Sequence, residues 1–159
     1  MTIKTGDKLP AGTLTVMGPD GPKPVTTEEL FNGKKVVMFA VPGAFTPGCS
    51  RTHLPGFVVN ADAISSRGVD SIICVAVNDV FVMDAWGKAQ NAERLIMAAD
   101  GNGDYTRALG LELDATGFGM GKRSKRYAMV VDDGTVSYLG VDTREIDNSS
   151  AETVLNNLN

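Results

Sequence analysis

Two continuous apolar runs constrain the fold of this chain more than any other feature. Residues 35–41 read Lys-Val-Val-Met-Phe-Ala-Val, and residues 69–77 read Val-Asp-Ser-Ile-Ile-Cys-Val-Ala-Val, so the polar residues lie only near the start of each run. Strands without polar alternation are buried on both faces, as in parallel sheets covered by helices. Residues 94–98 form a shorter run of the same kind. The chain is therefore predicted to build a central sheet with helices on both sides.

Helical segments are predicted between and after these strands. Thr26 and Glu29 have capping-box spacing, which predicts a short helix to Phe31, and residues 47–66 are predicted to be helical with a kink at Pro55-Gly56. Further helices are expected over residues 79–91 and 150–158, after a hairpin whose turn contains Asp132-Asp-Gly134. This order predicts an α/β protein of the thioredoxin-like type, with a mixed central sheet flanked by helices.

Composition narrows the class of protein. The 159 residues are 43% hydrophobic and 21% charged, so residues 1–159 are expected to form a single domain. The net charge of −4 gives no basis for nucleic-acid binding. No apolar run approaches the roughly 18 residues of a membrane span, and no secretory signal is visible at the N-terminus. A cytoplasmic location without membrane contact is therefore expected.

The chain has few soft ligands. Cys49, Cys74 and His53 are the only cysteine and histidine residues, which is too few for a typical structural zinc site. No metal site and no cofactor are therefore expected. A structural disulfide is uncommon in a reducing compartment, so both cysteines are predicted to be free thiols, either inert in the core or reactive.

Cys49 has the sequence context of a reactive thiol. It follows the end of the first long strand, where open α/β sheets place their sites. Thr46 suits an N-cap and Pro47 suits the first helical position, which puts Cys49 in the first turn near unpaired backbone N–H groups. Such a position favours the thiolate, which is the nucleophile. An inert buried cysteine remains the alternative on this evidence alone.

The segment around Cys49 closely resembles the active-site loop of peroxiredoxins. Pro42, Thr46 and Cys49 match the signature Pro-x-x-x-Thr-x-x-Cys, and the continuation Cys-Ser-x-x-His-x-Pro-Gly-Phe is similar to the peroxiredoxin-5 (type II) subfamily. The resemblance extends over essentially the whole chain. Members of this subfamily carry an arginine just before a strand, and Arg126 matches that position.

The resemblance implies a role for each matched residue. Cys49 would attack one peroxide oxygen, and Thr46 would hold the peroxide through its hydroxyl. Arg126, with its fixed charge and several donors, would face both the sulfur and the oxygens. The backbone N–H groups of Gly48 and Cys49 would complete the set of donors. Pro42 would pack over the sulfur and restrict access to it.

The implied function is a thiol-dependent peroxidase that reduces hydrogen peroxide and alkyl hydroperoxides through a sulfenic acid on Cys49. The resemblance implies glutathione with glutaredoxin as the reductant, with thioredoxin as the alternative. An oxidant-sensing redox-signalling protein without efficient turnover is the rival function. A disulfide oxidoreductase on the same core is disfavoured because no Cys-x-x-Cys motif is present.

Two other residues are open to different interpretations. Cys74 lies in an apolar strand, which favours an inert core thiol, although its participation as a resolving cysteine stays open. No cysteine occurs in the C-terminal stretch, where animal relatives carry a resolving one. His53 lies one turn from Cys49, but a structural hydrogen bond is preferred to a role as general base, because no third orienting residue is evident.

Aromatic residues near the predicted site indicate an interface. Phe45 lies in the loop before Cys49, and Phe118 lies between two glycines with no regular element to bury it. Contiguous apolar surface beside a site commonly marks an interface, and the resembled subfamily pairs through such loops. A two-fold homodimer that covers Phe45 and Phe118, which would border the bound substrate, is predicted.

Overall fold

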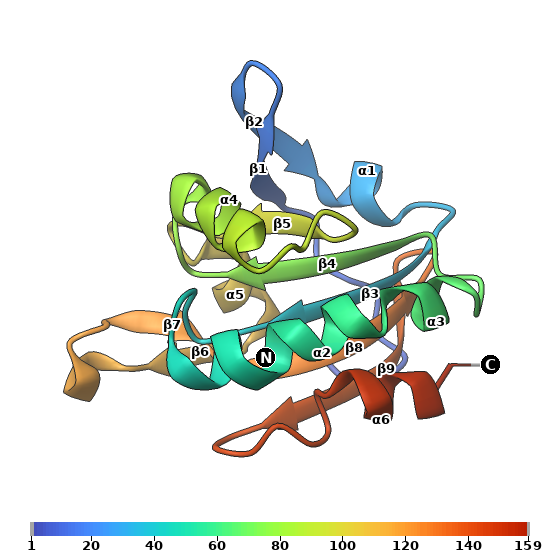
Figure 1. Ribbon diagram of the computed structural model, residues 1–159. Coiled ribbons are helices and arrows are strands. Elements are labelled where there is room, and N and C mark those ends of the chain that lie inside the picture. The colour runs from blue at the N-terminus through green and yellow to red at the C-terminus, as the bar shows by residue number, and fades with distance from the viewer. Residues whose placement is uncertain (1, 159) are drawn as a thin grey trace.

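The computed structural model describes residues 2–158, and its frame is a seven-stranded mixed sheet with the strand order β2-β1-β5-β4-β3-β8-β9 (Figure 1). Strands β3, β4 and β5 are parallel, and the other pairs are antiparallel. A separate antiparallel pair, β6-β7, stands beside this sheet. The strands are β1 (Thr13–Gly18), β2 (Gly21–Thr26), β3 (Lys35–Ala40), β4 (Ser71–Ala76), β5 (Ile96–Ala99), β6 (Glu112–Asp114), β7 (Lys122–Ser124), β8 (Arg126–Asp132) and β9 (Thr135–Asp142).

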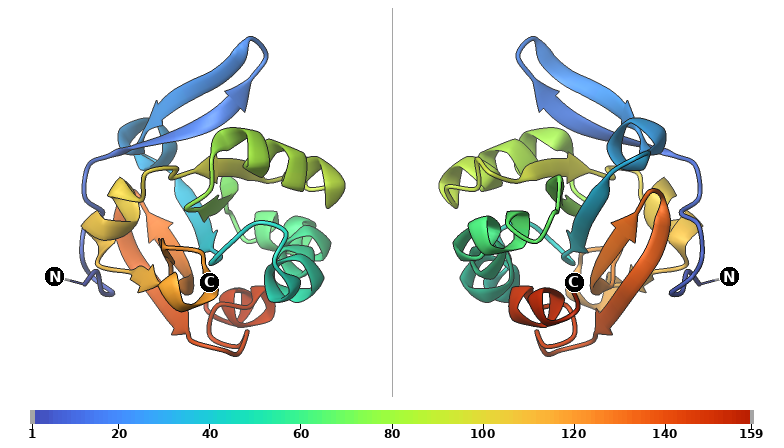
Figure 2. Two further views of the ribbon diagram at one scale, coloured as in Figure 1. Left: turned by 90° about the vertical axis from the view of Figure 1, so that its left-hand side faces the viewer. Right: turned by 90° about the vertical axis from the view of Figure 1, so that its right-hand side faces the viewer.

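Helices cover both faces of the sheet, as Figure 2 shows from two sides. One hydrophobic cluster joins the sheet to α2 (Leu54–Val59), α3 (Ala61–Ser65), α4 (Val80–Ala89) and α6 (Ala151–Asn156). A second cluster on the opposite face includes side chains of α1 (Thr27–Phe31) and α5 (Asp104–Leu109). The predicted thioredoxin-like α/β architecture is thus confirmed, with β3 and β4 buried on both faces.

Three local predictions are confirmed. Thr26 and Glu29 form the complete capping box of α1. The turn between β8 and β9 places Asp133 and Gly134 at φ angles of 48° and 81°, which is the left-handed backbone that a two-residue hairpin needs. Ser150 caps α6 by accepting a hydrogen bond from the backbone of Thr153. These elements formed as predicted because each depends on residues close together in the chain.

Other elements differ from the prediction. The β1-β2 hairpin was not predicted, because β2 contains Pro22 and Pro24, and prolines are tolerated only on an edge strand such as this one. The short α5 and the three-residue strands β6 and β7 were also missed. The helical stretch that begins at Pro47 breaks at Asn60 as well as changing pitch before Pro55.

Between residues 2 and 158, no helix has both the length and the apolar character needed to cross a membrane. In the same part of the chain, no group of three or more His, Cys, Asp or Glu side chains is arranged to hold a metal ion.

Candidate active site

The loop that follows β3 is held by hydrogen bonds within it and by the neighbouring parallel strand. The Thr46 hydroxyl donates to the carbonyl of Gly43 over 2.7 Å. The backbone N–H of Ala44 donates to the side-chain oxygen of Asn78, just beyond β4, over 2.9 Å. The Ser50 N–H donates to the Thr46 carbonyl over 2.9 Å, which makes Thr46 the residue that opens the helix. The loop is therefore fixed at the carboxyl ends of β3 and β4.

Thr46 lies at the predicted N-cap position, but its hydroxyl does not cap the helix. The hydroxyl donates a hydrogen bond to the Gly43 carbonyl instead. The helix begins at Pro47, and the N–H groups of Gly48 and Cys49 lie in its first turn, where no intrahelical acceptor is available. The Thr46 side chain does not satisfy them either. This leaves the lone pairs of the Thr46 oxygen and these two N–H groups at the same end of the helix.

Cys49 begins a π-helical turn, η1 (Cys49–His53), in which the N–H of Leu54 bonds to the carbonyl of Cys49. The wide turn lies directly before Pro55, whose ring would clash with the carbonyl four residues earlier in a regular helix. Cys49 is completely buried and belongs to the core cluster beneath α2. The same turn places Ser50 where its hydroxyl accepts a 2.9 Å hydrogen bond from the Trp86 indole.

Arg126 lies against the sulfur of Cys49. It begins β8, one residue before the Tyr127–Ala40 pair, so the sheet carries it to the carboxyl end of β3. Its Nη2 donates to Cys49 Sγ over 3.2 Å. The side chain is buried, and between residues 2 and 158 no carboxylate forms an ion pair with it. Its positive charge is therefore directed at the sulfur rather than neutralised by an acid.

His53 contacts the other side of the same guanidinium. Arg126 Nη1 lies 2.8 Å from His53 Nδ1, and His53 Nε2 lies 2.8 Å from the carbonyl oxygen of Ser149. Burial lowers the pKa of His53 to about 4, and the adjacent Arg126 charge acts in the same direction. The histidine makes structural hydrogen bonds, as preferred from the sequence, and its partners Arg126 and Ser149 could not have been predicted.

The other residues predicted for the site are Pro42, Gly48, Phe45 and Phe118, and they differ in how far they are buried. Pro42 is half-buried at the start of the loop, and Gly48 is exposed at the helix start. Phe45 has a φ angle of 65°, which is strained for a non-glycine residue, and its ring lies 6.4 Å from that of Trp86. Phe118 is 84% exposed and lies in the turn that joins β6 and β7, the hairpin that projects from the molecule in Figure 1. Cys49, by contrast, is completely buried.

Sequence reasoning missed two side chains that pack against the loop. Arg123 donates to the carbonyl of Met120 over 3.0 Å and, at a long 3.5 Å, to the carbonyl of Pro42. A Cβ at Gly43 would lie 3.1 Å from Arg123 Nη1, 3.1 Å from Thr46 Cγ2 and 3.2 Å from Met120 Cε. The β6-β7 hairpin therefore packs tightly on the active-site loop, and a side chain at position 43 would require these neighbouring side chains to shift by a few tenths of an ångström.

Cys74 lies in the core of the sheet. It is fully buried in β4 opposite Phe39 of β3, and it shares a hydrophobic cluster with Cys49. Burial raises the pKa of the Cys74 thiol well above its usual range, and the nearby Cys49 adds to this effect. The reactive thiolate form of Cys74 is therefore disfavoured.

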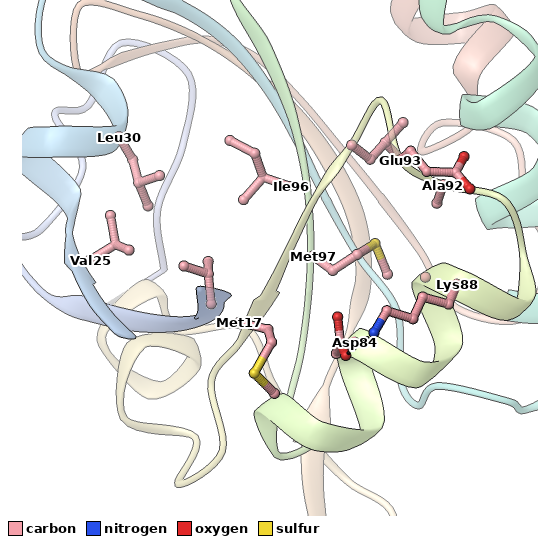
Figure 3. A pocket seen from close by; sticks show the side chains of 12 residues that line it. Met17, Val25, Leu30, Asp84, Lys88, Ala92, Glu93, Ile96 and Met97 are labelled. Atoms are coloured by element: carbon pink, nitrogen blue, oxygen red, sulfur yellow. Dashed lines mark ion pairs between the residues drawn. The ribbon is translucent and has the colours of Figure 1, made fainter. Parts of the chain in front are cut away.

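A cavity of about 500 Å³ lies elsewhere, between the β1-β2 hairpin, α4 and β5. Figure 3 shows Met17, Met97 and other apolar side chains around it, with the ion pair of Asp84 and Lys88 at one side. None of its lining residues belongs to the loop of residues 41–48 or to η1. The chemistry of Cys49 is therefore located outside this cavity.

The thioredoxin-like sheet places a buried cysteine in the first turn of a helix, next to an arginine that pairs with no carboxylate in residues 2–158. This arrangement is that of a thiol-dependent oxidoreductase. The Redoxin family matches residues 4–155. The chloroplastic peroxiredoxin-2E of Arabidopsis thaliana is 47% identical over 160 residues, covering 97% of this chain and 68% of that protein.

Solved structures agree with this relationship. Reduced Prx3 from Vibrio vulnificus in complex with hydrogen peroxide is 52% identical, with a TM-score of 0.96 over 99% of this chain and 100% of that one. Peroxiredoxin 5 from Alvinella pompejana is 36% identical, with a TM-score of 0.85 over 98% and 97% of the two chains. The chain belongs to the peroxiredoxins, of the peroxiredoxin-5 (type II) kind, and is a thiol-dependent peroxidase.

Proposed function

We propose that this peroxiredoxin reduces hydrogen peroxide and alkyl hydroperoxides through Cys49, which cycles via a sulfenic acid. The observation that carries the proposal is the 3.2 Å contact between Arg126 Nη2 and Cys49 Sγ, made by a buried guanidinium that no carboxylate neutralises within residues 2–158. The peroxide complex of the similar Vibrio vulnificus protein supports hydrogen peroxide as one substrate.

In the oxidative step, the Cys49 thiolate attacks one peroxide oxygen along the O–O axis. The S–O bond forms as the O–O bond breaks, and the leaving oxygen takes up a proton to become water or an alcohol. Because the Thr46 hydroxyl already donates a hydrogen bond to the Gly43 carbonyl, its oxygen is available to accept a hydrogen bond from the peroxide O–H. Arg126 and the free N–H groups of Gly48 and Cys49 stabilise the charge that develops on the leaving oxygen.

Donors to the oxygens contribute more than ionisation of the thiol does. A cysteine with an ordinary pKa of about 8.5 is already roughly 3% ionised at pH 7, so full ionisation gains only about 30-fold in rate. Removing one preorganised donor from a developing oxyanion costs about 100- to 1,000-fold in characterised enzymes. Arg126 therefore acts mainly on the transition state.

An external thiol completes the cycle. Its sulfur attacks the sulfenic acid and expels water to leave a mixed disulfide, which a second thiol then reduces. Cys74 is not proposed as the resolving residue because its thiol is buried and its pKa is raised. We propose glutathione with glutaredoxin as the donor and thioredoxin as the alternative, in a cytoplasmic setting that keeps both cysteines reduced.

The active form is proposed to be a two-fold homodimer. Phe45 is 55% exposed and Phe118 is 84% exposed, and the hairpin that bears Phe118 packs on the active-site loop through Arg123. Sedimentation of the reduced protein at micromolar concentration tests this. A Phe118→Ser variant is expected to shift toward monomer and lose activity, whereas Val59→Ser, at an exposed site on α2, is the matched control. A fully active monomer would contradict the link.

Peroxide consumption with the glutathione/glutaredoxin and thioredoxin systems, compared side by side, tests the function itself. Multiple turnover with the first system is the expected result. Rapid oxidation of Cys49 in a single turnover, with no turnover under either reductant, would instead identify an oxidant sensor. No reaction of Cys49 with any peroxide would overturn the proposal.

A further inference from the structure

We infer that His53 is a positioning residue, which holds the Arg126 guanidinium against Cys49 through a neutral imidazole protonated at Nε2. This inference deepens the proposed function and rests on it. Its basis is a continuous series of hydrogen bonds that runs from the sulfur through Arg126 and His53 to the carbonyl of Ser149.

The partners of His53 leave one tautomer. An arginine donates and has no acceptor, so Nδ1 of His53 must accept the 2.8 Å hydrogen bond from Arg126. A carbonyl oxygen only accepts, so Nε2 must donate over 2.8 Å to Ser149. A protonated imidazole would direct an N–H toward the guanidinium N–H and lose the first of these bonds. Burial keeps the ring neutral by lowering its pKa to about 4.

The far end of the series is anchored in the loop between β9 and α6. The Asp142 carboxylate accepts hydrogen bonds from the backbone N–H groups of Asp147, Asn148 and Ser149 over 3.0, 3.1 and 2.8 Å. It also accepts one from the Ser149 hydroxyl over 2.6 Å. Burial alone would raise the pKa of Asp142, but these hydrogen bonds hold it below the usual value. The Ser149 carbonyl is therefore a fixed acceptor rather than part of a mobile loop.

The imidazole is also held by its neighbours in the core. Its ring centre lies 5.0 Å from that of Phe39 and 5.6 Å from that of Phe57, and the residue is 1% exposed. A histidine that only filled the core would need no more than this packing against aromatic rings and one hydrogen bond to the backbone. The second, charge-assisted bond to Arg126 is what connects His53 to the reacting sulfur.

Loss of the Nδ1 acceptor would leave one guanidinium N–H of Arg126 buried without a partner. The cost of such an unpaired donor favours rotamers in which the guanidinium turns toward water, away from the sulfur. Since Nη1 and Nη2 belong to one rigid plane, moving Nη1 also moves the Nη2 that contacts Cys49.

Two substitutions separate this role from packing. The side-chain oxygen of His53→Asn occupies the place of Nδ1 and accepts from Arg126, whereas the amide of His53→Gln replaces Nε2 and leaves Arg126 without its acceptor. Both variants lose the aromatic ring, so their melting temperatures control for lost packing. The second-order rate of reaction with hydrogen peroxide is followed through Trp86, the only tryptophan, which is hydrogen-bonded to Ser50 beside Cys49.

We expect the second-order rate with hydrogen peroxide to be at least about tenfold below wild type in His53→Gln, which is the size expected for the loss of one charge-assisted hydrogen bond. In His53→Asn, which keeps an acceptor for Arg126, the same rate should fall by no more than about threefold. Alkylation of Cys49 by iodoacetamide, which has no leaving oxygen, should slow much less than the peroxide reaction in His53→Gln. If His53→Asn does not fold, this ratio of the two rates in His53→Gln still decides the matter.

Equal losses in the two variants, or equal slowing of alkylation and peroxide reaction in His53→Gln, would overturn the positioning role. So would a wild-type peroxide rate in His53→Gln. The failure of the wild-type protein itself to react with peroxide would instead overturn the proposed function, which keeps the two outcomes distinguishable.

Discussion

Replacing Arg126 by lysine tests how this site accelerates the reaction. The guanidinium of Arg126 serves two partners at once, Cys49 Sγ at 3.2 Å and His53 Nδ1 at 2.8 Å. Lysine keeps the positive charge but carries a single nitrogen on a shorter reach, so it cannot contact both partners in this geometry. The substitution therefore removes directed donors while it leaves most of the charge in place.

The two possible contributions of Arg126 differ in size. If the arginine only promoted ionisation of the thiol, its complete loss at pH 7 would cost at most about 30-fold. If it also donates to the leaving oxygen, the loss of that donor adds about 100- to 1,000-fold, or roughly 3–4 kcal/mol of transition-state stabilisation. We expect the rate constant for hydrogen peroxide to fall by more than about 100-fold in Arg126→Lys.

The assay combines a thiolate titration with rapid kinetics. The thiolate fraction of Cys49 is measured by ultraviolet absorbance against pH, and the peroxide rate is measured through Trp86 fluorescence. Arg94→Lys is the control, since Arg94 is exposed and pairs with Asp62. A rate loss in Arg126→Lys that the measured thiolate fraction fully explains would refute the donor role.

Three further experiments test the roles of the two cysteines, the neutral form of His53 and the close packing at Gly140. Cys49→Ser should abolish peroxidase activity while the buried Cys74→Ala retains a substantial part; equal loss in a folded Cys74→Ala would make Cys74 a resolving residue. Burial lowers the pKa of His53 to about 4, so between pH 6.5 and 4 the unfolded chain takes up a proton that the folded chain does not. The free energy of unfolding should therefore fall by up to roughly 3 kcal/mol as the pH drops through this range. Chemical denaturation should show a flatter pH dependence for His53→Asn, and an unchanged slope would contradict this assignment. Gly140→Ala should lower the free energy of unfolding by at least about 2 kcal/mol and reduce activity, because its Cβ would clash with the backbone oxygen of Asn148 in the loop that holds His53. Gly117→Ala, whose Cβ would meet no atom within 4 Å, should be neutral.

The extent to which the sequence predicted this molecule depends on how local each feature is. The strands β3 and β4 were predicted because their apolar runs are uninterrupted, and α1 because its capping box lies within four residues. The β1-β2 hairpin was hidden by the prolines of β2, which an edge strand tolerates.

The contacts of the site that join distant parts of the chain could not be predicted from local sequence patterns. Cys49 and Thr46 are indicated by the local strand–loop–helix pattern, but Arg126 is 77 residues away and was identified only through the family resemblance. The acceptor of His53 is a backbone carbonyl 96 residues along the chain, and a carbonyl has no sequence signature. The same holds for the packing of Arg123 on the loop at Gly43, which depends on the placement of a whole hairpin.

The complete burial of Cys49 has a consequence for the kinetic order of the two half-reactions. The residue has no exposed surface, and it starts the π-helical turn η1, in which the hydrogen bonds span five residues. A peroxide of a few atoms needs a smaller opening to reach the sulfur than a protein does. The thiol of a protein reductant must approach together with the surface around it, so this turn has to unwind first. Oxidation should therefore stay proportional to peroxide concentration. Re-reduction by a protein thiol such as thioredoxin should instead level off at high reductant concentration, at the rate with which the turn opens.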